Sequence, residues 1–306
     1  MENSILFGNG INRLISSNIS WGELLDKIKD VNKFEDNSLP NTMIYERIVL
    51  ERLPRYHDIL KDEFDIKKDI ALLLSKILAN ETYVDIFKLS AEHYITTNYD
   101  YGFISSIMDL PEITLPINEY STEDVYSIRR LKKINNATEL TKNFWQIHGE
   151  IRKPATIMLG LDHYCGSVGK IDSYIKGRYR YTSNSGHIVE RSIEKKFKEK
   201  SFNNSSWIEL FFTTNIYIIG FTLDFSEIDL WWIINKRARM MKTSGLRKFI
   251  KNEIHFYCDG IEEQKKSLLE SMNVVVHVIA LQGGGDMYVN HYRSLIKTIK
   301  AEIGGR

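Results

Sequence analysis

The sequence predicts an α/β fold, a Rossmann-like, doubly wound parallel sheet with an inserted, mostly helical smaller module. In the C-terminal third, short apolar runs typical of buried strands alternate with amphipathic helical patterns, as in parallel sheets. The strand-like runs lie at 216–220, 254–259 and 274–281, and the helical patterns at 228–234, 264–272 and 291–303. Near the start, the apolar run 5–7 leads through a Gly-rich turn at 8–12 into a helical pattern. Strand, Gly-rich turn and helix form the phosphate-binding arrangement of nucleotide folds.

Composition bounds the class of protein. The chain has 306 residues, 43% of them hydrophobic and 26% charged, with a formal net charge of +1. No global field therefore attracts nucleic acid or an anionic membrane, and we expect neither as a direct partner. Two cysteines, Cys165 and Cys258, make no disulfide framework. The most apolar region, 207–234, is broken by acidic residues, and the N-terminal residues lack a basic leader, so we expect a cytoplasmic protein.

Helical patterns in the sequence indicate which segments are inserted between the strands of the sheet. The chain between Gly10 and Tyr94 is far longer than a simple crossover needs. It contains several stretches with apolar residues at helical spacing. We therefore expect one domain over 1–306, with helical insertions at about 20–90 and 151–205.

Polar residues follow the predicted strands at the points where these strands end. Thr97, Asn98 and Asp100 follow one apolar run, and His148 follows the run that begins at Phe144. The carboxyl ends of parallel strands meet at one edge of the sheet, where ligands of open α/β sheets bind. Our hypothesis is that the loop from Gly8 to Asn12, Asn98 and His148 converge on one nucleotide.

Each candidate also has a structural interpretation. The turn at 8–12 lacks the full GxGxxG pattern because residue 13 is Arg13, so it can be a tight turn without a ligand. Asn98 can cap the turn that follows it, and His148 can be a satisfied core histidine. The occurrence of all three together favours function, because a site is a constellation of residues.

Three further patterns carry less weight. The basic cluster at 129–133 lies within a region, 101–141, that has no regular periodicity, and a solvated face explains it better than a phosphate contact. The aromatic and basic run at 174–181 resembles single-strand binding patches, but one short patch in a neutral chain is weak support. His163 and Cys165 fit no usual zinc spacing, so we expect no metal.

Several short segments occur in a specific order along the chain. They are Gly8-Asn9-Gly10-Ile11-Asn12-Arg13, Thr96-Thr97-Asn98-Tyr99-Asp100, Ile147-His148-Gly149-Glu150, the segments 157–160 and 163–166, and the segment from Ile219-Gly220-Phe221 through Asp229-Leu230-Trp231-Trp232. Together they resemble the sirtuin-like fold, and more closely the bacterial sirtuin-like NAD hydrolases of antiphage defence. The resemblance covers nearly the whole chain and implies a Rossmann-type domain with an inserted helical module.

The resemblance also implies roles for individual residues. Asn98 and His148 would be the catalytic pair, and Asp100 would orient or bind the nicotinamide ribose. The implied NAD-binding residues are Gly8, Asn9, Gly10, Ile11 and Asn12 at the pyrophosphate, Gly220, Phe221 and Asp259 at the adenosine half, and Thr97.

Two departures from the deacylating sirtuins shape the expected activity. A chain with two cysteines cannot build their four-cysteine zinc ribbon. The Gly-Ile-Pro-Asp-Phe-Arg-like segment that continues their first loop is missing after Asn12. Both departures favour plain NAD cleavage over deacylation or ADP-ribosyl transfer.

The expected activity is therefore that of an NAD glycohydrolase, with NAD as substrate and no metal cofactor. Its implied role is to deplete NAD during abortive infection, gated by a homo-oligomer or by a separate sensor protein. The alternative is a catalytically silent subunit that binds NAD or ADP-ribose. NAD cleavage needs a held ribose, a stabilised oxocarbenium-like centre and a positioned water, and an asparagine and a near-neutral histidine suit these tasks.

Overall fold

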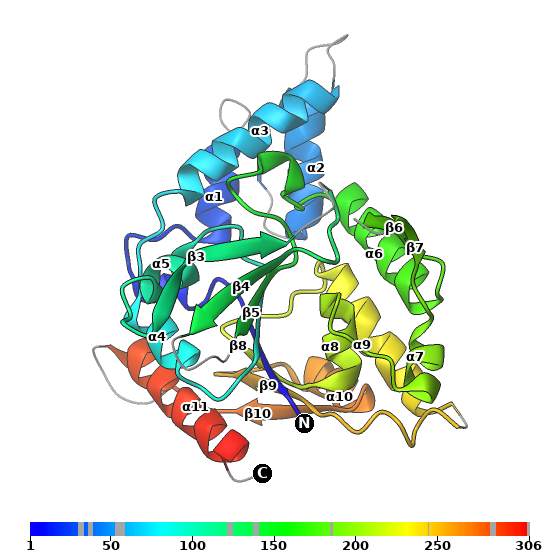
Figure 1. The fold of residues 1–306 in the computed structure, drawn as a ribbon. Coiled ribbons are helices and arrows are strands. Elements are labelled where there is room, and N and C mark those ends of the chain that lie inside the picture. The colour runs from blue at the N-terminus through cyan, green and yellow to red at the C-terminus, as the bar shows by residue number, and fades with distance from the viewer. Residues whose placement is uncertain are drawn as a thin grey trace.

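The computed structural model describes residues 1–29, 34–35, 39–52, 59–120, 125–136, 141–183, 186–243, 245–281 and 286–304. Within them, eight strands form one sheet in the order β10-β9-β8-β1-β2-β5-β4-β3 (Figure 1). The strands are β1 (Asn3–Phe7), β2 (His93–Thr96), β3 (Ile113–Tyr120), β4 (Leu131–Asn136), β5 (Lys142–Gln146), β8 (Asn215–Ile219), β9 (Ile254–Cys258) and β10 (Val274–Val278). Pairing is parallel from β10 to β5 and antiparallel from β5 to β3. The predicted Rossmann-like α/β class is confirmed.

The direction in which strands are added to the sheet reverses at β1. From β1 the chain adds β2 and then β5 on one side, and later returns to pair β8 with the other side of β1. Every residue of β8 is buried, as expected for a strand with both faces covered. Open α/β sheets bind their ligands beside such a reversal, at the carboxyl ends of the strands.

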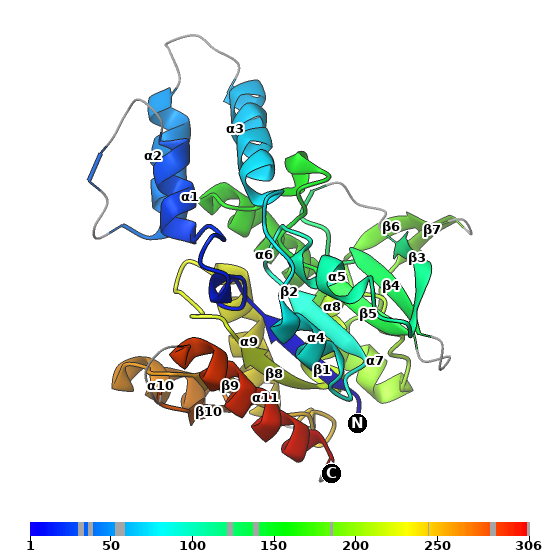
Figure 2. The ribbon, with the colours of Figure 1, turned by 90° about the vertical axis from the view of Figure 1, so that its left-hand side faces the viewer.

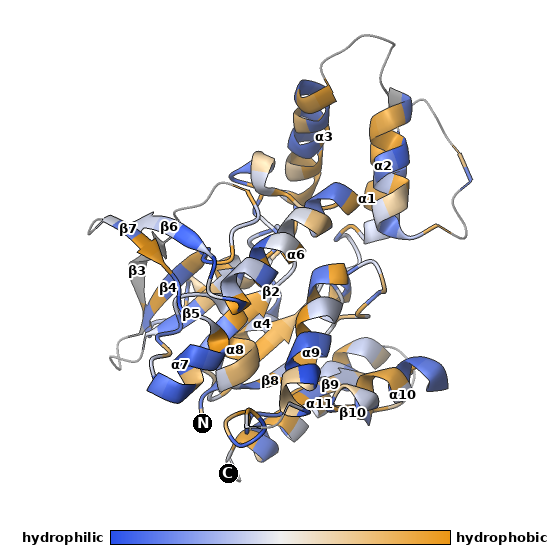
Figure 3. Cartoon of the chain, turned by 90° about the vertical axis from the view of Figure 1, so that its right-hand side faces the viewer, coloured by the Kyte–Doolittle hydropathy of each residue, from blue (hydrophilic) through white to orange (hydrophobic). Residues whose placement is uncertain are grey.

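Helices cover both faces of the sheet because successive strand residues point to opposite sides. Leu6 of β1 joins the core on one face, whereas Ile5 and Phe7 join the core on the other. The face with Leu6 is covered by α8 (Trp207–Thr213), α9 (Ile228–Met241) and α10 (Glu263–Ser271), and α6 (Leu161–Ile175) and α7 (Ile193–Glu199) lie further out. The face with Ile5 and Phe7 is covered by α4 (Glu81–Phe87), α5 (Gly102–Ile107) and α11 (Met287–Gly304). Hydropathy follows this layering, with apolar strands inside and hydrophilic residues on α7 (Figure 3).

A helical module stands beyond the carboxyl edge of the sheet (Figure 2). It consists of α1 (Trp21–Ile28), α2 (Asn41–Arg52) and α3 (Ile59–Leu74), whose own apolar core also includes Tyr99 and Leu159. In the predicted insertion at 20–90, α4 belongs to the sheet face and not to this module. No helix in the described ranges is long and apolar enough to cross a membrane.

The region 151–205, expected to be helical, also contains strands. It holds α6, α7 and a two-stranded hairpin of β6 (Arg180–Ser183) and β7 (Gly186–Val189) that the sequence did not indicate. Two short 3₁₀ helices, η1 (Asn12–Leu14) and η2 (Pro154–Thr156), complete the described elements.

The basic cluster at 129–133 leads into β4, and two of its cations are buried. Lys132 Nζ lies 2.7 Å from Glu150 Oε2, and Arg130 Nε lies 3.6 Å from Glu150 Oε1. The interpretation of this cluster as a solvated face is therefore wrong for Arg130 and Lys132. Attraction between the buried carboxylate and the two cations offsets part of the desolvation penalty of placing these charges in the sheet.

Candidate functional site

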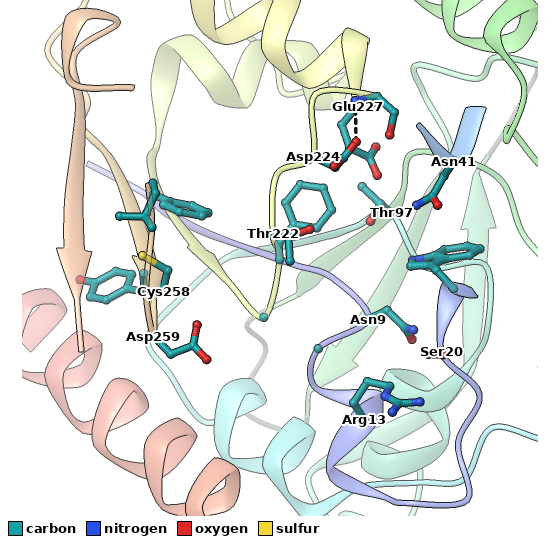
Figure 4. Close-up of a pocket in the computed structure, with 18 of the residues that line it drawn as sticks. Asn9, Arg13, Ser20, Asn41, Thr97, Thr222, Asp224, Glu227, Cys258 and Asp259 are labelled. Carbon is teal, nitrogen blue, oxygen red and sulfur yellow. Dashed lines mark hydrogen bonds between the residues drawn. The ribbon is translucent and has the colours of Figure 1, made fainter. Parts of the chain in front are cut away.

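A cavity of about 870 Å³ lies at the carboxyl edge of the sheet, where the order of strands reverses. This volume falls within the range of about 300–1,000 Å³ that is usual for small-molecule sites. The loops that follow β1, β2, β5, β8 and β9 all contribute to its walls, and α1, α2 and α11 contribute from outside the sheet. Thr97 and Glu227 lie at one end of the cavity, and Cys258 and Asp259 at the other (Figure 4).

The structure brings many of the predicted site residues to this cavity. Those that line it are Asn9, Gly10, Thr97, His148, Gly220, Phe221 and Asp259. Those that do not are Gly8, Ile11, Asn12, Asn98 and Asp100. Arg13 and Lys265, which were not predicted, add two cations to the walls.

The glycines after β1 allow a close approach between two loops. The Gly8 amide donates to the Ile219 carbonyl at 3.3 Å, and the Gly10 amide donates to the Gly220 carbonyl at 2.9 Å. A Cβ at Gly8 would lie 2.4 Å from Phe221 Cδ2, and a Cβ at Gly10 would lie 2.8 Å from the Gly220 carbonyl oxygen. These two amides are thus engaged within the protein, and the glycines are needed for packing.

Asn12 and Asp100 hold the loops together behind the cavity. Asn12 Nδ2 donates to Asp100 Oδ2 and to Asn9 Oδ1, both at 2.9 Å. The Gly102 amide donates to Asp100 Oδ1 at 2.7 Å, which fixes the start of α5. Burial raises the pKa of the Asp100 carboxyl despite these hydrogen bonds. Both oxygens of Asp100 therefore bind the protein itself.

Asn98 lies beside a second, much smaller cavity of about 10 Å³, which Trp21 and Tyr99 also line. The Trp21 and Tyr99 rings meet edge to face, with their centroids 5.3 Å apart. Asn98 Nδ2 lies 3.4 Å from the Tyr83 hydroxyl. Its Oδ1 is buried and accepts no hydrogen bond from any part of the chain that the structure describes. Buried acceptors are normally satisfied, so this oxygen is suited to a ligand or a water.

His148 is the most strongly positioned side chain of the site. It is 1% exposed, and its Nε2 lies 3.1 Å from the carboxylate of Asp229, which is itself inaccessible to solvent. Ser167 Oγ and the Leu230 amide donate to Asp229 at 3.0 and 2.9 Å. Asp229 therefore fixes the ring orientation and places the proton on Nε2.

The other ring nitrogen of His148 faces the cavity. Nδ1 lies 3.5 Å from Glu227 Oε2 and 3.5 Å from the Tyr164 hydroxyl, and both of these residues line the cavity whereas Asp229 does not. The Tyr164 hydroxyl donates to Glu227 Oε2 at 3.1 Å. Nδ1 is thus the nitrogen available to exchange a proton with a bound molecule.

Burial and charge shift the pKa values of both His148 and Glu227. Burial by itself lowers the pKa of His148, but the charge and hydrogen bond of Asp229, together with Glu227, outweigh burial and raise it. Burial also raises the pKa of Glu227 to about 7. A carboxyl group with a pKa of about 7 beside a histidine with a shifted pKa is typical of acid–base sites.

Glu227, Asp229 and Tyr164 were not predicted from the sequence as site residues. Asp229 and Tyr164 lie in segments that carried the sirtuin-like resemblance, and the acidic residues between 224 and 229 closely follow β8. The sequence signal for these residues was the group of acidic side chains that follows the buried strand β8. Its pairing with His148, 81 positions earlier, was not readable from spacing.

Three ligand atoms of this group are also close enough to hold a metal ion. Those of His148, Glu227 and Asp229 lie within 4.8 Å of one another. The hydrogen bonds described above account for the same positions without an ion. The absence of a metal from this site stays a prediction.

Comparison with known proteins does not identify the chain. No protein-family model and no curated protein matches the sequence. The sirtuin-like resemblance therefore stays a prediction, and the site is interpreted from its own geometry. That geometry combines a cavity at the strand-order reversal, a buried histidine oriented by a carboxylate, and a carboxyl group that titrates near pH 7.

Proposed function

We propose that the protein is an NAD glycohydrolase, which converts NAD and water into ADP-ribose and nicotinamide. The observation that carries this proposal is His148, whose Nε2 is held by Asp229 and whose Nδ1 faces the cavity beside Glu227. Nucleotides bind open α/β sheets at this position. The sirtuin-like motifs supply the choice of NAD.

In the proposed reaction, the bond between the anomeric carbon and the nicotinamide nitrogen breaks, and its electron pair neutralises the pyridinium. Positive charge develops on the ribose, where the carboxylate form of Glu227 stabilises it. A water oxygen forms the new bond to the anomeric carbon, and its proton passes to Nδ1 of His148. The Asp229 carboxylate stabilises the imidazolium that results.

The adenosine half would extend along the cavity toward β9. Asp259 lies at that end, where an acidic side chain can accept hydrogen bonds from ribose hydroxyls. Arg13 and Lys265 would face the phosphates, although Arg13 Nη1 now lies 2.8 Å from Glu23 and Lys265 Nζ donates to the Thr222 carbonyl. NAD binding would exchange these contacts for phosphate contacts.

We also propose that the NAD-cleaving activity is gated, and that the protein acts as the NAD-depleting effector of an antiphage system. Trp21 and Tyr99 line both cavities, whereas Asn98 lines only the small one, so in this proposal Asn98 reaches substrate only after the contact between the two rings opens. A homo-oligomer or a sensor protein that moves α1 would supply that opening. Trp21→Ala is expected to raise nicotinamide release by the isolated chain, whereas Trp232→Ala on α9 leaves it unchanged.

The test is release of nicotinamide from NAD by the purified chain, with and without the products of neighbouring genes. His148→Ala is expected to abolish turnover, and His187→Ala on the exposed β6–β7 hairpin serves as the matched control. Turnover that survives His148→Ala would reject the site.

A second candidate function is a regulatory subunit that binds NAD or ADP-ribose without turnover. The separation of Asn98 from the large cavity favours it. Calorimetry would show NAD binding that His148→Ala leaves intact, with no nicotinamide released under any condition, including with Trp21→Ala.

A further inference from the structure

We propose that the protein has a zinc site, separate from the nucleotide cavity, formed by His255 of β9, His277 of β10 and Glu302 of α11. One ligand atom from each of these three residues lies within 4.8 Å of the others. None of the three lines the large cavity. The site is independent of the proposed NAD chemistry.

The distances between donor atoms approach those of a tetrahedral zinc site. His255 Nδ1 lies 3.0 Å from His277 Nε2 and 3.9 Å from Glu302 Oε2. Zinc bonds of about 2.0–2.2 Å in a tetrahedron place neighbouring donors about 3.3–3.5 Å apart. Shifts of a few tenths of an ångström in the side chains would bring all three donors into range.

Outer contacts orient the ligands as they do in known zinc sites. Glu253 Oε2 lies 3.3 Å from Nε2 of His255, so this nitrogen has a carboxylate beside it, whereas Nδ1 faces the other two residues. The Tyr257 hydroxyl donates to Glu302 Oε2 at 2.7 Å. Zinc-bound histidines and carboxylates usually have such partners, which fix tautomer and orientation.

The rigidity of the strands further fixes two of the ligands. The rings of Tyr217 and His255 stack at 5.0 Å, and those of Tyr257 and His277 stack at 4.3 Å, so neither imidazole rotates freely. A preformed pair of imidazoles lowers the entropic cost of binding an ion.

The donor set favours zinc over the hard cations. Two imidazoles and one carboxylate suit Zn²⁺, whereas Mg²⁺ and Ca²⁺ prefer all-oxygen sites. The ion would tie the end of α11 to the outer strands of the sheet. The same helix contributes Tyr288, His291 and Tyr292 to the nucleotide cavity, so the ion would also steady one wall of it.

Without an ion, the two histidines share one hydrogen bond, in which one imidazole donates to the other. Zinc would replace that proton, so binding releases it and weakens as the pH falls. A purely structural histidine pair would instead show no zinc dependence.

The experiment measures Zn²⁺ binding to the full chain after chelator treatment, by calorimetry and by thermal unfolding, with Mg²⁺ as the control ion. One Zn²⁺ per chain and a rise in Tm are expected with zinc and not with Mg²⁺. His277→Gln and Glu302→Gln should each weaken binding at least about tenfold, and Glu253→Gln by about 10–100-fold through the outer contact. His187→Gln, in the exposed hairpin, should bind as the wild type does.

A second variant separates this site from the group at the cavity. Zinc binding that is lost in Glu227→Gln but retained in His277→Gln would place the ion at His148 and overturn the proposal. Absence of zinc binding by the wild-type chain would overturn it as well. Circular dichroism of each variant establishes that loss of binding is not loss of folding, and Glu302→Gln replaces His277→Gln if the latter does not fold.

Discussion

At the scale of single residues, the proposed chemistry depends on Asp229, whose charge opposes the effect of burial on the pKa of His148. Burial favours the neutral imidazole, and Asp229 favours the charged one strongly enough to raise the pKa of His148. The same carboxylate selects the tautomer that presents Nδ1 to the cavity. Asp229 is therefore a positioning residue that acts through His148.

Asp229→Asn should change both the rate and its dependence on pH. The variant removes the charge that opposes burial, so the pKa of His148 falls, and the acid limb of kcat/KM should move down by about one pH unit or more. The wrong tautomer should lower kcat on the order of 100-fold or more. Nicotinamide release measured across pH checks both effects, and an acid limb at the wild-type position would contradict the role given to Asp229.

Glu227→Gln should flatten the dependence of stability on pH. Burial raises the folded-state pKa of Glu227 from 4.5 to about 7, so between these values the folded protein holds a proton that the unfolded chain releases. This contribution to stability is complete below pH 4.5 and is lost as the pH rises through about 7, a change of about 3 kcal/mol. Tm of the wild type should thus fall more than that of Glu227→Gln between about pH 5 and about pH 8. Parallel Tm curves for the two proteins would refute the assignment.

The predicted residues that the structure places at the large cavity include side chains that closely follow a strand. Thr97 and His148 follow β2 and β5, and both reach the cavity. Asn98 also follows β2 but lines only the small cavity, because side-chain direction in a loop is set by tertiary packing. Partners from distant segments, such as Asp229, leave no local pattern.

At the scale of elements, apolar runs identified the parallel strands because those strands are buried on both faces. β4 was missed because it carries Lys132, a cation that Glu150 neutralises inside the protein. A hydrophobic pattern cannot reveal a strand whose buried positions are charged and paired. The junction between β1 and its loop was recognised from its glycines, although their use is close packing between loops.

A matched pair of glycine substitutions tests that explanation. A Cβ at Gly10 would lie 2.6 Å from the Tyr292 hydroxyl and 2.8 Å from a backbone oxygen, so Gly10→Ala should lower stability by about 1–3 kcal/mol. Gly169 lies within α6 and a Cβ there meets nothing within 4 Å, so Gly169→Ala should raise stability by about 0.5–1 kcal/mol. Denaturant unfolding of both variants measures this, and destabilisation by Gly169→Ala alone would contradict it.

At the scale of the whole molecule, the module of α1, α2 and α3 has an incompletely covered apolar surface. Its exposed apolar side chains include Leu50, Leu60 and Leu72, which are 63%, 74% and 65% exposed, whereas every residue of the central strand β8 is buried. Several large apolar side chains exposed on one module are typical of an interface. The sequence anticipated a homo-oligomer only through the family resemblance, since exposure depends on how the helices pack.

We predict that this module mediates self-association of the chain. Leu60→Glu and Leu72→Glu place a charge among apolar side chains on α3, which disfavours burial of that surface against a second copy. Light scattering should then give an assembly for the wild type and a single chain for these variants. Leu268→Glu on α10, where the side chain is 36% exposed, is the control and should assemble normally.

If assembly also gates the site, the two α3 variants should lose nicotinamide release as they dissociate. A wild-type chain that remains single at every concentration would leave the opening of the Trp21 contact to a separate sensor protein.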